Sequence, residues 1–130
     1  MKNLNRIDKN NLGTKGGFDF PLSDESTPIT TGVKYTTKLV YGLELNIVQC
    51  FCTVAPTITN IIVDMLKNGV SILTNKCIIP IGTKNSTFGL INNTTILDID
   101  EVSFEVLQGD AVGVGLKVQG KGWELNSVRI

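Results

Sequence analysis

The densest group of ligating side chains is a short acidic run, Asp98, Asp100 and Glu101. Carboxylate oxygens are the ligands that Ca²⁺ prefers, and loop carbonyl groups could complete its coordination shell. A solvated turn leading into a strand at Val102 explains the same run more simply. A calcium site is therefore a minor alternative, and the sequence predicts no cofactor.

A second chemistry open to acidic residues is glycoside hydrolysis, which requires two carboxyl groups facing one cleft. Asp64 is the acid in the most unusual position, because it interrupts the apolar run formed by Ile62, Val63 and Leu66. We expect Asp64 on an exposed or subunit-facing side of a strand. The acids are scattered along the chain, so we prefer this position for Asp64 over a catalytic role, and hydrolysis by carboxylates alone stays open as an alternative.

Nucleophilic and zinc chemistry are disfavoured by composition. The chain has no histidine, which removes Ser-His-Asp and Cys-His arrangements and the commonest zinc and iron sites. Cys50, Cys52 and Cys77 lack the spacing of a metal-binding motif, and an odd number of cysteines does not make a disulfide framework. We expect three small buried residues in a reducing compartment. The chain is therefore not expected to be an enzyme.

Aromatic residues are sparse, at 6% of the chain. Tyr35, Tyr41 and the single tryptophan, Trp123, could line a platform on which sugar rings stack. Core packing or subunit contact is the expectation that we prefer, and glycan binding is kept as the alternative. The sequence contains no glycine-rich phosphate loop and no stripe of interleaved basic and aromatic residues, so no nucleic-acid partner is predicted.

Charge is balanced overall but uneven along the chain. Lys and Arg number 12, as do Asp and Glu, so net charge gives no sign of a nucleic-acid or membrane partner. Residues 1–17 nevertheless carry a net charge of +3 and show no hydrophobic period, and their cations are Lys2, Arg6, Lys9 and Lys15. We interpret residues 1–17 as an extended basic anchoring arm that another chain holds, with a disordered tail as the alternative.

Membrane insertion and secretion are not expected. No apolar run approaches the roughly 18–20 residues needed to span a bilayer. The N-terminus has positive charge but lacks the apolar segment of a secretory signal.

The clearest structural signal is a hairpin centred on Asn68-Gly69, between two runs rich in Ile, Val and Leu. A type I′ turn requires φ > 0 at both central residues, which Asn tolerates and Gly accepts freely. We therefore expect a two-residue turn within Lys67–Val70, followed by a bend or bulge near Asn75.

Alternating hydrophobic segments continue through the rest of residues 18–130, and no helical pattern is present. Pro21 favours an edge strand after Phe18 and Phe20. The segment from Leu43 to Val54 is expected to place Leu45 and Val48 on opposite faces. Further strands are expected at 88–91, 95–99, 102–106 and 112–118, and residues 123–130 are expected to form a last short strand or an extended tail. About eight strands at near-regular spacing predict one all-β domain, a jelly-roll-like antiparallel sandwich.

Three segments resemble, in order, small β-sandwich virion proteins of tailed bacteriophages. The first resembles an opening "LSDE…TTG" strand and comprises Phe20–Glu25 with Thr30–Gly32. The second resembles a "VDI-x-x-NG-x-SIL-x-x-K" hairpin and comprises Val63–Met65, Asn68-Gly69, Ser71–Leu73 and Lys76. The third resembles a closing "G-x-G-LKV" strand and comprises Gly109-Asp110, Gly113 and Gly115–Val118. The basic arm and the segment Trp123–Ile130 lie outside the resemblance.

The resemblance implies a head-fibre, capsid decoration or cement protein, or a tail-fibre module, often a trimeric jelly roll. We accordingly expect a non-enzymatic virion protein, made in the host cytoplasm and located on the capsid surface. Its partner would be the major capsid protein or another virion protein, contacted through Lys2, Arg6, Lys9 and Lys15. The alternative is a glycan- or host-receptor-binding module of a phage tail or fibre.

Overall fold

The structure is a computed structural model that describes residues 12–125, and within that range it contains eleven strands and no helix. The strands are β1 (Leu12–Pro21), β2 (Gly32–Thr37), β3 (Leu43–Phe51), β4 (Ile61–Lys67), β5 (Val70–Ser71), β6 (Leu73–Asn75), β7 (Cys77–Ile79), β8 (Leu90–Ile91), β9 (Thr95–Ile96), β10 (Val102–Gln108) and β11 (Lys117–Leu125). No helix in this range is long and apolar enough to cross a membrane.

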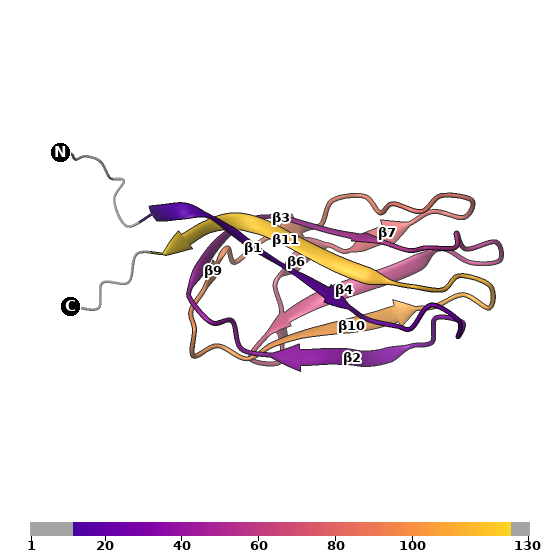
Figure 1. Cartoon of the computed structure of the whole chain (residues 1–130), viewed down its shortest axis with the longest axis horizontal. Coiled ribbons are helices and arrows are strands. Elements are labelled where there is room, and N and C mark those ends of the chain that lie inside the picture. The colour runs from indigo at the N-terminus through magenta and orange to yellow at the C-terminus, as the bar shows by residue number, and fades with distance from the viewer. Residues whose placement is uncertain (1–11, 126–130) are drawn as a thin grey trace.

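Two antiparallel sheets pack face to face (Figure 1). The first has the strand order β1-β11-β3-β9, and the second has the order β2-β10-β4, with both β5 and β7 pairing with β4. The chain passes repeatedly between the sheets, and the last strand returns to lie between β1 and β3. This arrangement is the jelly roll, and it confirms the expected all-β sandwich.

The strand count exceeds the expected eight because the second arm of the hairpin is broken into pieces. Asn68 and Gly69 have φ values of 52° and 83°, and Lys67 pairs with Val70, so the predicted turn is confirmed. The chain then leaves β4 at β6, which pairs with β8, and returns at β7. The bend expected near Asn75 is therefore a change of pairing partner.

Aromatic residues fill the core between β1, β2 and β10. The ring of Phe104 is fully buried, and its centroid lies 5.5 Å from that of Phe18 and 5.8 Å from that of Phe20. Gly120 on β11 makes room for this cluster, because a Cβ atom there would lie 2.2 Å from the Phe18 ring. Glycine is thus required beneath Phe18 by close packing.

A bulge in β3 corrects the expected division of its two faces. Lys121 pairs with Ile47 and Gly122 with Leu45, so Asn46 is an extra residue in the ladder. The bulge reverses the alternation, and both Leu45 and Val48 are buried in the core. The expectation that they lie on opposite faces is wrong.

The closing strand also differs from the expected one. Residues 112–118 were expected to form a strand, but β11 begins at Lys117 and continues to Leu125. The Asp110 carboxylate accepts hydrogen bonds from the N–H groups of Val112 and Gly113, at 2.8 and 2.7 Å, and holds that segment in a turn. Residues 126–130 lie outside the described range.

The boundary between arm and body lies earlier than the sequence suggested. Residues 12–17, which were assigned to the arm, belong to β1, and Leu12 pairs with Leu125. The body therefore begins at Leu12, and β1 is an edge strand, as Pro21 indicated. The arm residues Lys2, Arg6 and Lys9 lie outside the described range, whereas Lys15 lies on β1.

Candidate functional site

The acidic run at Asp98–Glu101 secures the hairpin turn. Asp100 accepts hydrogen bonds from the Asn68 side-chain amide at 2.9 Å and from the Leu97 N–H at 2.8 Å. The Leu97 bond, together with the Asn68 amide and Lys67, lowers the pKa of Asp100 against the effect of burial. Asp98 and Glu101 are exposed, and no group of three metal-ligating residues occurs among residues 12–125. These contacts account for the acidic run as a turn that leads into β10.

Asp64 is buried, so the expectation of an exposed or subunit-facing side chain is wrong. The residue is 5% exposed, and its carboxylate accepts a hydrogen bond from the Ser71 hydroxyl at 2.7 Å. The Lys76 ammonium lies 3.5 Å from the same carboxylate oxygen. Both partners come from the second arm of the hairpin, which explains how a charge is tolerated inside an apolar strand.

The three cysteines are free and buried, as expected. A hydrogen bond between Cys50 and Cys77, followed by burial, raises the pKa of Cys50 well above its ordinary value. A thiol with a raised pKa is a poor nucleophile, because the thiolate is the reactive form. Because all three cysteines are buried, with 0–3% exposure, we assign them to packing.

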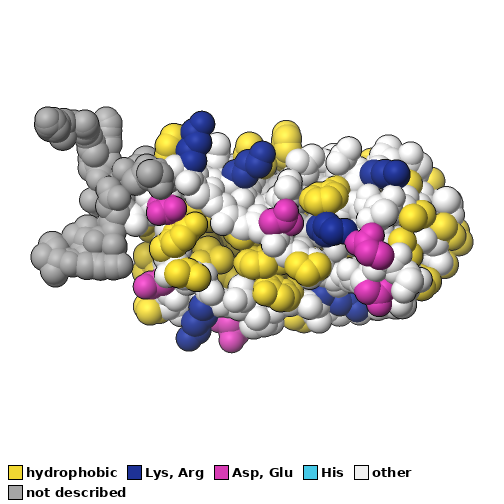
Figure 2. Space-filling model, viewed as in Figure 1, with side chains coloured by type: hydrophobic (Ala, Val, Ile, Leu, Met, Phe, Trp, Pro, Cys, Tyr) yellow, Lys and Arg dark blue, Asp and Glu magenta, His cyan; other side chains and the backbone are white. Residues whose placement is uncertain are grey.

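The first surface feature is an apolar groove between β1 and β2, which we call the side groove. It has a volume of about 240 Å³ and is lined mainly by Phe18, Phe20, Leu39, Val40 and Tyr41. Val40 is 92% exposed. The apolar patch is visible next to the grey terminal segments in Figure 2. Both flanking strands are sheet edges, so the side groove lies between two rows of backbone groups that no other strand of the described chain pairs.

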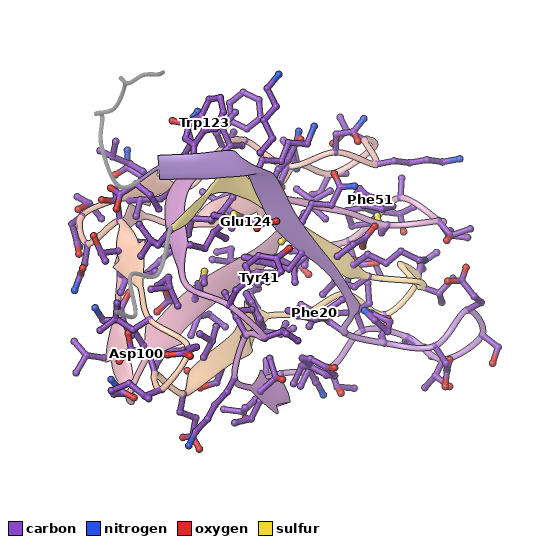
Figure 3. The ribbon with its side chains drawn as sticks, turned by 60° about the vertical axis from the view of Figure 1, so that its left-hand side comes forward. Phe20, Tyr41, Phe51, Asp100, Trp123 and Glu124 are labelled. Carbon is purple, nitrogen blue, oxygen red and sulfur yellow. The ribbon has the colours of Figure 1, made fainter. Side chains whose placement is uncertain are left out.

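The second surface feature lies on the outer side of the sheet formed by β1, β11 and β3. We call it the lysine–tryptophan face and define it by Lys15, Asn46, Ile47, Lys121 and Trp123, which line a shallow groove of about 250 Å³. Figure 3 shows Trp123 on the outside of the sheet, whereas Tyr41 lies on its inner side. The Lys15 ammonium is 6.0 Å from the centroid of the Trp123 ring.

The structure separates residues that the sequence grouped together. Tyr35 packs against Phe20, with ring centroids 4.6 Å apart, while Tyr41 lines the side groove and Trp123 lies on the lysine–tryptophan face. The three aromatic residues therefore do not form one platform. Lys15, assigned to the arm, instead contacts Trp123 from the neighbouring strand.

Sequence reasoning missed Lys121 and Asn46 as partners of Trp123. The signal for Lys121 was present, because a strand alternating Gly120, Lys121, Gly122 and Trp123 places lysine and tryptophan on one face. No comparable signal exists for Asn46, since its position depends on a bulge.

No protein-family model matches the chain, and neither the curated proteins nor the solved structures include one that matches it.

Proposed function

We propose that this protein is a non-enzymatic structural protein of tailed-bacteriophage virions, a capsid decoration, cement or head-fibre protein on the capsid surface. Two lines of support are the jelly-roll fold, which recurs in viral capsid proteins, and the three ordered motifs that resemble virion proteins. Two polar clusters among the described residues, around Asp64 and Asp100, hold the hairpin in place.

The observation that carries the proposal is the placement of the two chain ends. Leu12 pairs with Leu125, so the segments that precede and follow the sandwich both begin at one end of it (Figure 1). A basic segment at that end can attach to an acidic shell while the opposite end stays free. Lys2, Arg6 and Lys9 would contribute charge complementarity and register more than affinity.

Deletion of residues 2–11 is the test of attachment. The deletion must stop before Leu12, because removing Lys15–Gly17 would also remove part of the pairing with β11. We expect the truncated protein to keep its melting temperature and to lose binding to capsid shells of the encoding phage, measured by co-sedimentation. A variant lacking residues 126–130 is the matched control. Undiminished decoration by the 2–11 deletion would disprove attachment through the arm.

Self-association, expected as a homotrimer, is assigned to the side groove with a second copy of the chain as its occupant. The lining of the groove is mostly apolar, with Lys38 as its one charged residue beside the hydroxyl groups of Thr37 and Tyr41. Its flanks are two unpaired strand edges, which are templates for contact with another copy. Exposed apolar side chains of this kind mark protein–protein contacts.

Val40→Asp is the test of self-association. We expect wild-type protein to have about three times the chain mass of 14.1 kDa by light scattering, and the variant to fall to one chain mass, because a charge would be buried in the contact. Val70→Asp is the matched control, since Val70 is also exposed, at 68%, but lies at the hairpin turn. A variant that keeps the wild-type mass, or a monomeric wild type, would refute the assignment.

A second candidate function is a glycan- or host-receptor-binding module of a phage tail or fibre. The observation that favours it is the exposure of Trp123, at 39%, in a shallow groove. Jelly rolls also occur in lectins, so the fold is compatible with both functions.

A further inference from the structure

We infer that the lysine–tryptophan face is a binding site for an acidic glycan, a linear saccharide whose units carry spaced carboxylates. The inference names the ligand and the site of the second candidate function and rests on it, while capsid attachment through residues 1–11 is independent of it. Four observations on the outer face of the β1-β11-β3 sheet lead to this ligand.

The first observation is a stacking surface. Trp123 projects from the outer side of β11 (Figure 3), and it is partly exposed although most large apolar side chains of this strand pair face the core. A flat aromatic ring with an apolar face and a polar edge suits a sugar, which also has an apolar face and polar hydroxyl groups. The ring is held in position by Lys15 across the β1–β11 pair.

The second observation is a pair of cations without acidic partners among residues 12–125. Lys67, Lys76 and Lys117 each form an ion pair, whereas Lys15 and Lys121 form none with any residue in 12–125. Lys121 lies two residues from Trp123 and therefore on the same side of β11. A ligand carboxylate placed beside a sugar ring on Trp123 would meet these two ammonium groups.

The third observation is a set of polar groups brought to the same face. The bulge in β3 exposes Asn46 next to Ile47 in the groove, and bulges commonly redirect side chains at functional sites. Further along the sheet, Gln119 pairs with Gln49 across β11 and β3, while their neighbours Val118 and Cys50 are buried on the opposite side. These amides can exchange hydrogen bonds with ligand hydroxyl groups.

The fourth observation is the length of the face. A second lysine–aromatic pair, Lys117 with Phe51, closes the other end, with the ammonium 5.8 Å from the ring centroid. Lys117 and Trp123 are six positions apart on β11, which corresponds to about 20 Å of strand. An extended oligomer fits this span better than a single sugar ring.

The composition of this face argues against two other kinds of ligand, a polyphosphate chain and a protein. Asp19 and Glu44 lie on outward positions of β1 and β3, so a polyphosphate chain would meet repulsion as well as attraction. Lysine is depleted in protein–protein interfaces, which makes a protein partner less suited to this face. A saccharide with carboxylates spaced along an otherwise neutral chain fits the mixture of lysines, amides and aromatic rings.

The test uses Trp123 as its own reporter, because it is the one tryptophan of the chain. We would titrate the full-length protein with linear hexagalacturonate and follow tryptophan emission. We expect a saturable change in tryptophan emission, and the affinity obtained from it should decrease with added salt. The neutral hexamer cellohexaose should cause no such change. Lys121→Ala should weaken binding about tenfold. Lys34→Ala, which changes a lysine on β2 in the other sheet, should leave it unchanged.

Trp123→Ala removes the reporter, so its binding would be measured by calorimetry and its folding by thermal melting. Loss of hexagalacturonate binding with an unchanged melting temperature would support the site. No emission change up to millimolar hexagalacturonate, equal binding of cellohexaose, tighter binding of oligothymidylate, or an unaffected Lys121→Ala variant would each overturn the inference. Capsid binding assayed on the same samples separates failure of this site from failure of the virion assignment.

Discussion

Replacing Asp110 by alanine is expected to destabilise the sandwich by about 3–4 kcal/mol, because several backbone donors lose a charged acceptor together. Asp110 is 5% exposed and follows the C-terminal end of β10, which points away from the two chain ends (Figure 1). One carboxylate oxygen accepts hydrogen bonds from Ile58 and Thr59 at 2.9 Å, and the other accepts those from Val112 and Gly113. A single side chain thus joins two loops.

The same carboxylate predicts how stability depends on pH. Burial acts to raise the pKa of Asp110, but hydrogen bonds from Thr59, Gly113, Val112 and Ile58 outweigh it and lower the pKa well below the ordinary value of 3.8. A group whose pKa is depressed by folding stabilises the fold fully above its unfolded pKa and loses that contribution as pH falls through the folded pKa. Stability should therefore decline below about pH 4.

Urea unfolding monitored by circular dichroism at several pH values is the measurement. Asp110→Asn keeps an acceptor but removes the charge, so its stability should fall between wild type and Asp110→Ala at neutral pH and change less with acid. Asp98→Ala, an exposed acid, is the matched control and should shift stability by no more than about 0.5 kcal/mol. Equal acid sensitivity of wild type and Asp110→Asn would contradict the prediction.

Replacing Phe104 by alanine is expected to cost about 3–5 kcal/mol, the usual range for removing a fully buried phenylalanine. Phe104 lies on β10 and contacts both Phe18 and Phe20 of β1, so its ring connects the two sheets. The cavity would form next to the Phe18 ring, for which Gly120 makes room on β11. Loss of this ring should therefore loosen the pairing of the first and last strands.

Equilibrium unfolding would measure the change, and hydrogen exchange of the β1 and β11 amides would locate it. Phe88→Ala is the matched control, because Phe88 is 61% exposed and should change stability by no more than about 0.5 kcal/mol. If Phe104→Ala and Phe88→Ala cost the same, the proposed link between the sheets would be refuted.

Features with a local cause could be predicted from sequence. The Asn68-Gly69 turn was predictable because only a few residue types accept φ > 0, and both positions have such a residue. The edge position of β1 was likewise indicated by Pro21, which cannot donate a backbone hydrogen bond. The all-β class followed from alternation that recurs along most of the chain.

Features that depend on distant partners could not be predicted. Asp64 is an acid within an apolar run, and its burial becomes understandable only when Ser71 and Lys76 are seen beside it. The face to which Leu45 turns depends on the bulge at Asn46, which is created by pairing with β11. The candidate glycan site arises from the same long-range pairing, because Lys15 and Trp123 come from the two ends of the chain.

The pairing of Leu12 with Leu125 has a mechanical consequence. Tension between the two chain ends would pull β1 and β11 apart from one end, so their backbone hydrogen bonds would break one after another. Tension between Leu12 and the loops at the opposite end of the sandwich would instead act along β1. The hydrogen bonds between β1 and β11 are perpendicular to that direction, so all of them would resist the force together. If the sandwich is attached through its first residues and force is applied at the opposite end, the load therefore acts in the direction in which the pairing of β1 and β11 resists it better.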